Sequence, residues 1–248
     1  MYDTTIDNLV EYEPIMTFIT APTPMHDNGM VDASIVEDAV LKLITHTKSL
    51  VVIKSTITPD VINRLYNSIH DDDKLRLTYN PEFLTENSAK EQFIYSSYHV
   101  LGGCSTESCS RVIDFYNQFS LCVGRNFITM TPQEASFVKY AINSYLGMKV
   151  TFFNQLYDAA LDFGSSPNRI INAVAADNRV GYSHTRVPGF DGKKGFGGAC
   201  LPKDMNAFVK FNKDLTLIAE SVKINNKMRE EYELDEREKS NNIKFGEK

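Results

Sequence analysis

A glycine-rich segment that delivers a cysteine carries the clearest chemical signal in this sequence. Residues 195–204 read Gly-Phe-Gly-Gly-Ala-Cys-Leu-Pro-Lys-Asp. Glycine permits positive φ and a close approach of the backbone to a ligand, and a lysine near a cysteine favours the thiolate, which is the nucleophile. The segment therefore indicates a nucleophilic Cys200. The alternative is a buried cysteine after a surface turn, with Asp204 in the first turn of a helix.

A lysine and an asparagine form the second candidate group. Lys139 and Asn143 are four residues apart, so on a helix they share one face. If that face is buried, the ammonium and the amide could stabilise a developing alkoxide. The alternative is a solvated polar stripe.

Polar residues also follow three predicted strands, namely Thr23, Thr56 and the pair Glu82 and Glu86. Ligands of open parallel sheets bind beyond the carboxyl ends of the strands. We therefore expect these side chains to face one crevice. Their alternative role is that of ordinary loop or helix-cap residues.

The apolar pattern predicts the scaffold for these groups. Strand-like runs occur at Ile15–Ala21, Leu50–Ser55, Leu75–Asn80, Tyr98–Gly103 and Asn126–Met130. Helical patterns lie between most of them, at Ala33–Thr47, Pro59–Ile69 and Glu107–Phe119. Strands that alternate with helices predict βαβ units and a parallel sheet.

After Pro132 the pattern becomes helical throughout. A long amphipathic helix is predicted over Glu134–Phe163, followed by helices at Asn168–Asp177, at Lys203–Asn212 and from Leu215 onward. Long helices of this kind often pair across a subunit interface. The charged end, Arg229–Lys248, is predicted to be solvated or frayed.

The expected fold class is thus α/β, with a truncated Rossmann-like parallel sheet followed by an all-helical dimerisation and catalytic domain. The predicted divisions are residues 1–131, residues 132–232 and a charged tail over residues 233–248.

Composition narrows the possible functions. The 248 residues are 42% hydrophobic and 23% charged, with a net charge of −6, which is ordinary for a globular protein. The absence of a basic block argues against nucleic acid as a partner. We expect no membrane span or signal peptide. The cysteines, Cys104, Cys109, Cys122 and Cys200, lack zinc-site spacing, so we expect no metal and four reduced thiols, three structural and one reactive, in a cytoplasmic protein.

The segment at 195–204 closely resembles the active-site segment of the UDP-glucose 6-dehydrogenase family. Four further segments resemble the family in the same order along the chain: Ala21–Pro24, Ile53–Thr56, Asn80–Glu86, and Lys139–Asn143 with Phe153-Asn154. The sequence contains neither the family's glycine-rich dinucleotide fingerprint nor its C-terminal nucleotide-binding third. The nearest approach to G-x-G-x-x-G begins at Gly195, has Cys200 in place of the third glycine and follows no strand.

The resemblance implies a four-electron oxidation of UDP-glucose to UDP-glucuronate with NAD as cofactor. Cys200 would attack the aldehyde formed by the first oxidation, giving a thiohemiacetal and then a thioester. Lys139 and Asn143 would hold the oxyanion. Asp204 and Glu82 would assist hydrolysis of the thioester by water.

The resemblance also implies the binding residues. NAD would contact Thr23, Thr56, Glu86 and Lys203, and the nucleotide sugar would contact Phe83, Leu84, Arg179, Phe196 and Gly197. Arg179 would reach the sugar from the neighbouring subunit of a homodimer. Because the glycine fingerprint that holds the pyrophosphate is missing, we expect the chain alone to bind NAD weakly.

Two other functions stay open. The chain could oxidise another nucleotide sugar, such as GDP-mannose or a UDP-N-acetylhexosamine, or it could be a non-catalytic remnant that dimerises and binds or regulates. The presence of Cys200, Lys139, Asn143 and Asp204 favours an enzyme, whereas the missing glycine loop favours the remnant.

Overall fold

The computed structural model describes residues 6–85 and 88–246. The chain divides into two compact units, each with its own hydrophobic core. Unit 1 comprises Met1–Thr23 and Asp32–Lys139, and unit 2 comprises Pro24–Val31 and Tyr140–Lys248. Helix α7 (Pro132–Asp162) begins in unit 1 and ends in unit 2. The predicted functional divisions at residues 131 and 232 stay a prediction.

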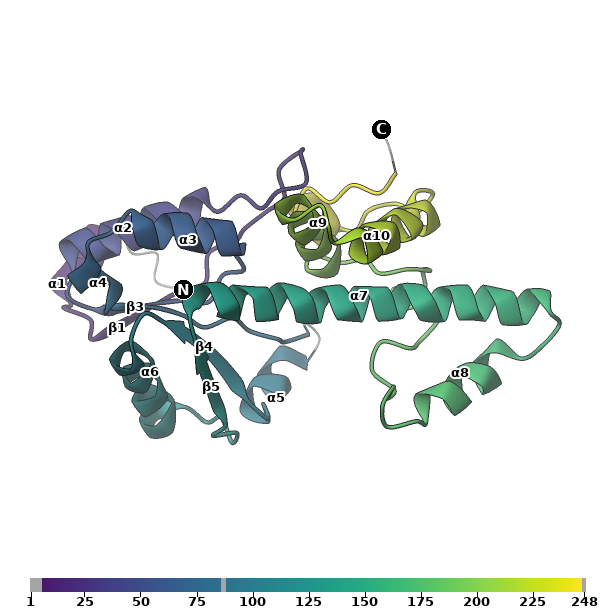
Figure 1. Ribbon diagram of the computed structural model, residues 1–248, viewed down its shortest axis with the longest axis horizontal. Coiled ribbons are helices and arrows are strands. Elements are labelled where there is room, and N and C mark those ends of the chain that lie inside the picture. The colour runs from purple at the N-terminus through teal and green to yellow at the C-terminus, as the bar shows by residue number, and fades with distance from the viewer. Residues whose placement is uncertain (1–5, 86–87, 247–248) are drawn as a thin grey trace. The chain divides into compact units, whose positions relative to one another are not determined.

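Unit 1 contains a five-stranded sheet with the strand order β1-β2-β3-β4-β5 (Figure 1). The strands are β1 (Met16–Ile19), β2 (Leu50–Ile53), β3 (Leu77–Tyr79), β4 (His99–Gly103) and β5 (Phe127–Met130), which confirms every predicted strand. The pairs β1–β2, β2–β3 and β4–β5 are parallel. Strands β3 and β4 are antiparallel, so the sheet is mixed rather than wholly parallel, and the α/β fold class is confirmed.

Helices cover both faces of this sheet. On one face, Val51 and Ile53 pack in a cluster with α2 (Ser34–His46) and α3 (Pro59–Asn67). On the other face, Leu50 and Val52 pack with α6 (Thr106–Phe119) (Figure 1). Strand β2 is therefore buried on both sides, as central strands of parallel sheets are. The short helices of this unit are α1 (Ile6–Glu11), α4 (Asp71–Lys74) and α5 (Ala89–Ile94).

The start of α7 is fixed by a capping box. The backbone N–H of Thr131 donates to Oε2 of Glu134 at 2.8 Å, and the N–H of Glu134 donates to Oγ1 of Thr131 at 3.3 Å. Pro132 occupies the first helical position, where its missing N–H has no cost. These residues begin a helix that extends to Asp162, which confirms the predicted long helix.

Unit 2 is helical. Besides α7 it contains α8 (Pro167–Ala175), α9 (Leu201–Phe211), α10 (Thr216–Arg229) and α11 (Glu236–Ser240). Its main cluster joins Tyr140 of α7 with Met205 and Phe208 of α9 and Val222 of α10. The helices predicted near residues 168, 203 and 215 are therefore present.

The predicted solvated or frayed end is wrong for the described part of the tail. Residues Glu236–Ser240 form α11, whose N-terminus carries a capping box between Asp235 and Glu238. Ile243 and Phe245 then bury their side chains against Met25. The segment is ordered because the capping box fixes the start of α11 and these apolar residues bury surface against Met25.

No helix within residues 6–85 and 88–246 is both long and apolar enough to cross a membrane. The same residues contain no cluster of three or more His, Cys, Asp or Glu side chains that could hold a metal ion.

Candidate active site

The loops that follow β1, β2 and β3 are tied to one another at the carboxyl edge of the unit 1 sheet. Ser55 Oγ donates to the carbonyl of Ala21 at 2.7 Å. Lys54 Nζ donates to Asn80 at its backbone oxygen (3.3 Å) and at Oδ1 (3.0 Å). These bonds join three loops beyond adjacent parallel strands.

Thr23, Thr56 and Glu82 lie in these three loops, at the edge where they were predicted. Thr23 is buried, and Thr56 and Glu82 are half-buried. Their roles stay predictions. Glu86 lies outside the described residues, so its predicted contact with the cofactor stays a prediction.

Lys139 is bound to the loop that carries Glu82. Its Nζ donates to the backbone oxygen of Glu82 at 2.7 Å and lies 3.4 Å from Oε1 of the same residue. It also lies 5.6 Å from the centre of the Phe83 ring. The backbone N–H of Leu84 donates to Oε2 of Glu82 at 2.6 Å. Lys139 is only 2% exposed, so a solvated stripe is the wrong interpretation, and the lysine holds the backbone and carboxylate of Glu82 together.

A second lysine of this unit was not singled out from the sequence, although it lies in the segment Ile53–Thr56. Burial lowers the pKa of Lys54 to about 8, an effect that the negative charge of Glu82 partly opposes. Lys54 Nζ also lies 3.4 Å from the hydroxyl of Tyr116, which donates to Asn80 Oδ1 at 2.7 Å. Burial raises the pKa of Tyr116 to about 12. This buried group fixes Asn80, two residues before Glu82.

In unit 2, Cys200 is the N-cap residue of α9 and is exposed. Pro202 lies in the first turn, as is common where a helix begins. The N-terminus of a helix carries partial positive charge, which favours an anion such as a thiolate. The glycine-rich turn therefore places the cysteine where a nucleophile is both accessible and electrostatically supported.

The buried carboxylate of Asp204 has two partners in the same unit. Asn143 Nδ2 donates to its Oδ2 at 2.6 Å, and Lys203 Nζ donates to its Oδ1 at 2.6 Å. All three side chains are buried, so a solvated stripe is wrong for Asn143 as well. The structure thus brings together Asn143, Lys203 and Asp204, three of the predicted site residues.

The remaining predicted residues are distributed differently. Phe83 and Leu84 are half-buried beside Glu82. Phe196 is buried in the main cluster of unit 2, so its side chain serves packing. Arg179 is exposed and makes two side-chain hydrogen bonds to Asp177, at 3.0 and 2.6 Å. Its predicted role in a neighbouring subunit stays a prediction.

Two asparagines that hold the glycine-rich segment have roles that the sequence did not indicate. Asn154 Oδ1 accepts a hydrogen bond from the N–H of Gly195 at 3.0 Å. Asn225 Oδ1 accepts from the N–H of Phe196 at 2.6 Å, and its Nδ2 donates to the carbonyl of Phe196 at 3.0 Å. Asparagine is disfavoured inside helices unless its side chain has a partner. The presence of Asn154 inside α7 and of Asn225 inside α10 was therefore the signal in the sequence that these side chains have partners.

The carboxyl edge of the unit 1 sheet fits one part of NAD. The hydroxyls of Thr23 and Thr56 are groups that can hydrogen-bond a carboxamide or a ribose. The pyrophosphate is normally held by a G-x-G-x-x-G turn at a helix N-terminus, and the sequence contains no such motif after a strand. The residues present therefore suit the nicotinamide end of the cofactor.

A five-stranded sheet covered by helices, followed by a helical unit, defines an α/β protein with a second, helical unit. Residues 2–120 match the NAD-binding domain of the UDP-glucose/GDP-mannose dehydrogenase family, and residues 133–228 match its central domain. The chain belongs to the UDP-glucose/GDP-mannose dehydrogenase family, and NAD is the cofactor of the matched domain.

Similar proteins agree with this assignment. A UDP-glucose 6-dehydrogenase from Rickettsia bellii is 30% identical over 88% of this chain and 50% of its own length, and one from Rickettsia typhi is 33% identical over 86% and 49%. The structure of a UDP-glucose dehydrogenase from Pyrobaculum islandicum has a TM-score of 0.75 and 31% identity, covering 89% of this chain and 52% of that one. The chain thus spans about half the length of these relatives.

Proposed function

We propose that the chain takes part in the NAD-dependent oxidation of UDP-glucose to UDP-glucuronate, with Cys200 as the nucleophile. The observation that carries the proposal is the exposed Cys200 at the N-terminus of α9, followed within one turn by the buried Lys203 and Asp204. The similarity to UDP-glucose 6-dehydrogenases supports the choice of substrate.

The proposed reaction needs two oxidations. The first converts the C6 alcohol of the sugar to an aldehyde, and the second converts the Cys200 thiohemiacetal to a thioester. NAD, when bound, accepts one hydride in each. The Cys200 thiolate adds to the C6 aldehyde, forming a C–S bond, and the thiohemiacetal is oxidised to a thioester. Water then adds to the thioester carbonyl, and the C–S bond breaks to release the carboxylate and the thiol. A thiol suits both steps because it is a strong nucleophile and a good leaving group.

The proposed roles of the other residues follow from the resemblance of their segments to the family. Lys139 and Asn143 supply an ammonium and an amide that stabilise the oxyanion, and the buried carboxylate of Asp204, with Glu82, accepts a proton from the attacking water. Thr23, Thr56, Glu86 and Lys203 are assigned to NAD. Phe83, Leu84, Arg179, Phe196 and Gly197 are assigned to the nucleotide sugar, although the side chain of Phe196 is buried and its N–H and C=O are both bound to Asn225.

We also infer a homodimer formed through α7 and α10. Unit 2 carries a groove of about 510 Å³ whose lining is mostly apolar and includes Tyr145, Phe152 and Leu217. These three side chains are exposed, and an apolar surface of this kind commonly binds another protein surface. A second copy of the chain is the partner that the long helix favours.

The experiment that tests the function measures NADH absorbance with UDP-glucose, GDP-mannose and UDP-N-acetylglucosamine at a saturating concentration of NAD. Because the chain alone is expected to bind NAD weakly, we expect at most slow NADH formation with UDP-glucose, with two equivalents per UDP-glucuronate formed. The variant C200S should lose thioester formation while retaining its fold. If NADH forms with GDP-mannose alone, GDP-mannose and not UDP-glucose is the substrate. Full turnover by C200S would show that Cys200 is not the nucleophile. No NADH with any sugar would favour a binding role.

A further inference from the structure

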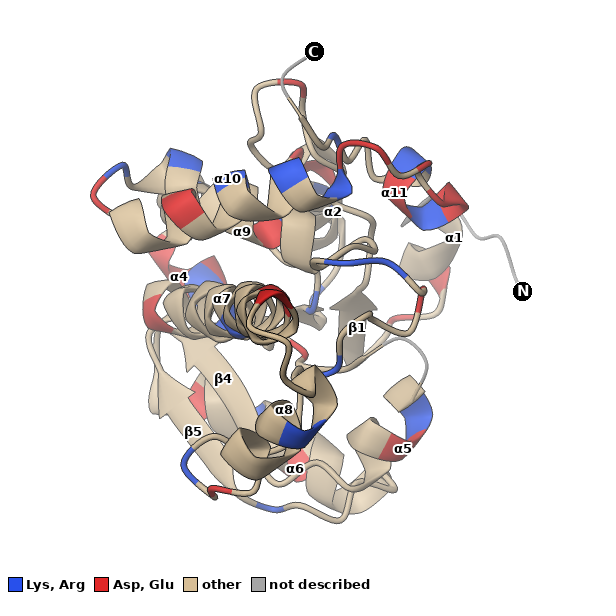
Figure 2. Ribbon diagram, turned by 90° about the vertical axis from the view of Figure 1, so that its right-hand side faces the viewer, with Lys and Arg blue, Asp and Glu red and all other residues tan. Residues whose placement is uncertain are grey.

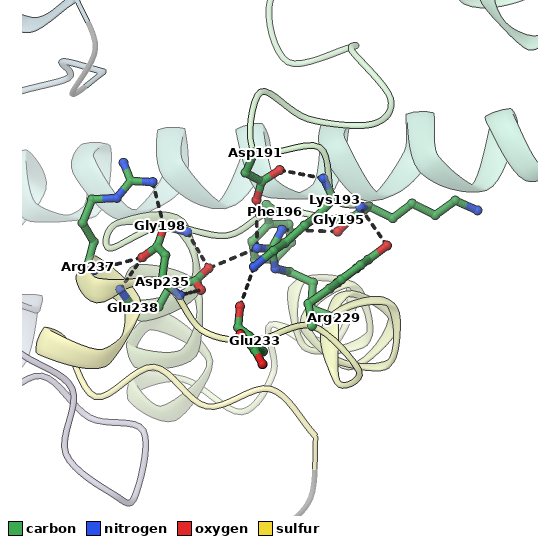
Figure 3. A network of polar contacts seen from close by, with 12 residues as sticks. Asp191, Lys193, Gly195, Phe196, Gly198, Arg229, Glu233, Asp235, Arg237 and Glu238 are labelled. Carbon is green, nitrogen blue, oxygen red and sulfur yellow. Dashed lines mark hydrogen bonds and ion pairs between the residues drawn. The ribbon is translucent and has the colours of Figure 1, made fainter.

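Three helices each supply one side chain that accepts a hydrogen bond from a backbone N–H of the glycine-rich segment before Cys200. Asn154 of α7 binds Gly195, and Asn225 of α10 binds Phe196. The third acceptor is Glu238 of α11, whose Oε1 accepts from the N–H of Gly198 at 3.0 Å. Figure 3 shows Glu238 beside Gly198. Gly198 lies two residues before the cysteine, so of the three acceptors Glu238 binds the segment at the position nearest to Cys200 in sequence.

Glu238 is half of a buried ion pair. Arg229 Nη2 donates to Oε1 of Glu238 at 3.1 Å and to Oδ2 of Asp191 at 2.9 Å. Arg229 and Glu238 are each 1% exposed, and the guanidinium lies 5.1 Å from the centre of the Phe245 ring. Removing two such charges from water is costly. The pair offsets this cost only because further hydrogen bonds satisfy both groups, from Gly198 and Asp235 to Glu238 and from Arg229 to Asp191.

The ion pair explains why residue 197 is glycine. A Cβ on Gly197 would lie 2.3 Å from Arg229 Nη2 and 2.5 Å from Glu238 Oε1, which is far inside van der Waals contact. The next residue, Gly198, has φ of +77°, a conformation that side chains disfavour. The pair therefore packs directly on the turn. Its close approach to Gly197 and the hydrogen bond to Gly198 both restrict the backbone conformation of the turn.

Helix α11 is itself anchored, so it can hold this turn in place. Glu238 Oε2 accepts the N–H of Asp235 at 2.9 Å and closes the capping box. Beyond the helix, Asn242 Nδ2 donates to the carbonyl of Met25 at 2.9 Å, and Ile243 and Phe245 pack on Met25. The helix is almost entirely charged (Figure 2), yet its one buried charge points to the cysteine loop.

We propose that Arg229 and Glu238 are positioning residues for Cys200. The hydrogen bond from Gly198 to Glu238 and the packing of the Arg229–Glu238 pair on Gly197 hold this turn, and we call these contacts the latch. The latch thereby fixes the cysteine at the N-terminus of α9. The proposal rests on the proposed role of Cys200 as nucleophile and assigns a function to the C-terminal segment. Without the latch the turn gains freedom, and the thiolate spends less time at the helix N-terminus that stabilises it.

The test measures the rate of Cys200 alkylation by iodoacetamide as a function of pH, in the 248-residue chain carrying C104S so that Cys104 does not compete. We expect E238Q to slow alkylation near neutral pH by about tenfold and to move the pH profile upward. The control E236Q changes an exposed residue of the same helix, paired with Lys239, and should leave the profile unchanged.

Two further variants keep the test decisive if E238Q is unstable. The double variant R229M/E238L replaces the pair with apolar groups that can maintain the fold but cannot accept from Gly198, and G197A displaces the pair by steric contact. Both should slow alkylation. A wild-type pH profile in any folded variant of the pair would overturn the latch, leaving only a structural role. Because alkylation needs neither NAD nor a sugar, a failure of the proposed oxidation would be seen separately in the NADH assay.

Discussion

The amide nitrogen of Asn143 donates to Oδ2 of Asp204 at 2.6 Å, while Oδ1 of the same carboxylate accepts from Lys203 at 2.6 Å. Both oxygens of Asp204 are thus engaged inside the protein, one by an amide of α7 and one by an ammonium of its own helix. Two hydrogen bonds from different segments fix the orientation of this carboxylate.

Replacing the buried carboxylate should reveal the strength of this arrangement. D204N leaves the Lys203 ammonium buried without a counter-charge, so we expect a loss of about 3 kcal/mol in the free energy of unfolding. Urea denaturation measures the change. The control D214N alters an exposed aspartate after α9 and should change the free energy by less than about 0.5 kcal/mol. If K203M/D204N is no more stable than D204N, the buried ammonium is not the cause of the loss.

The thiols of the chain should differ in reactivity. Cys109 and Cys122 are buried, whereas Cys104 and Cys200 are exposed. Partial desolvation by its surroundings raises the pKa of the Cys104 thiol, while Cys200 lies at the N-terminus of α9. We expect iodoacetamide to label Cys200 at least about tenfold faster than Cys104 at neutral pH, as followed by mass spectrometry of the digested protein. Equal rates for the two exposed thiols would contradict the assignment of Cys200 as nucleophile.

Much of the scaffold could be predicted from the sequence because its signals are local. Short apolar runs located all five strands, and helical periodicity located α7, α8, α9 and α10. The antiparallel pairing of β3 with β4 could not be predicted, because an apolar run has the same pattern in either direction.

Only part of the candidate site could be predicted from the sequence, because local patterns do not report contacts between distant segments. Cys200, Lys139 and Asn143 have side chains with recognisable chemistry, whereas the roles of Arg229 and Glu238 depend on contacts between distant segments. A run of charges predicts a solvated end on composition alone. The apolar residues that order this end, Ile243 and Phe245, pack on Met25, a pairing that no local pattern contains.

The proposed dimer should depend on the apolar residues of the unit 2 groove. Leu217 is 73% exposed, so L217E should leave the folded monomer intact but place a charge in the interface and prevent association. Light scattering at micromolar concentration should report a dimer for the wild type and a monomer for L217E. The control K223Q changes a lysine on the same helix that does not line the groove. A monomeric wild-type chain would remove the dimer and with it any role of Arg179 in a neighbouring subunit.

The buried lysine behind Glu82 should make stability depend on pH. The pKa of Lys54 is about 8 in the folded protein against an ordinary 10.5, so between these values the unfolded chain binds more protons than the folded one. The free energy of unfolding must therefore rise with pH across this window. Tyr116, whose pKa is raised from 10.0 to about 12, acts in the opposite sense, but only above pH 10.

The variant K54M removes this titration, and the comparison with wild type isolates it. We expect the stability of the wild type relative to K54M to increase by about 2 kcal/mol between about pH 8 and pH 10, from urea denaturation at each pH. The matched control is K42M, because Lys42 is half-exposed and paired with Asp38 on the surface of α2; its difference from wild type should stay constant over the same range. A constant difference for K54M too would mean that Lys54 keeps its ordinary pKa, and that the hydrogen bonds to Asn80 and Tyr116 offset the cost of burying its charge.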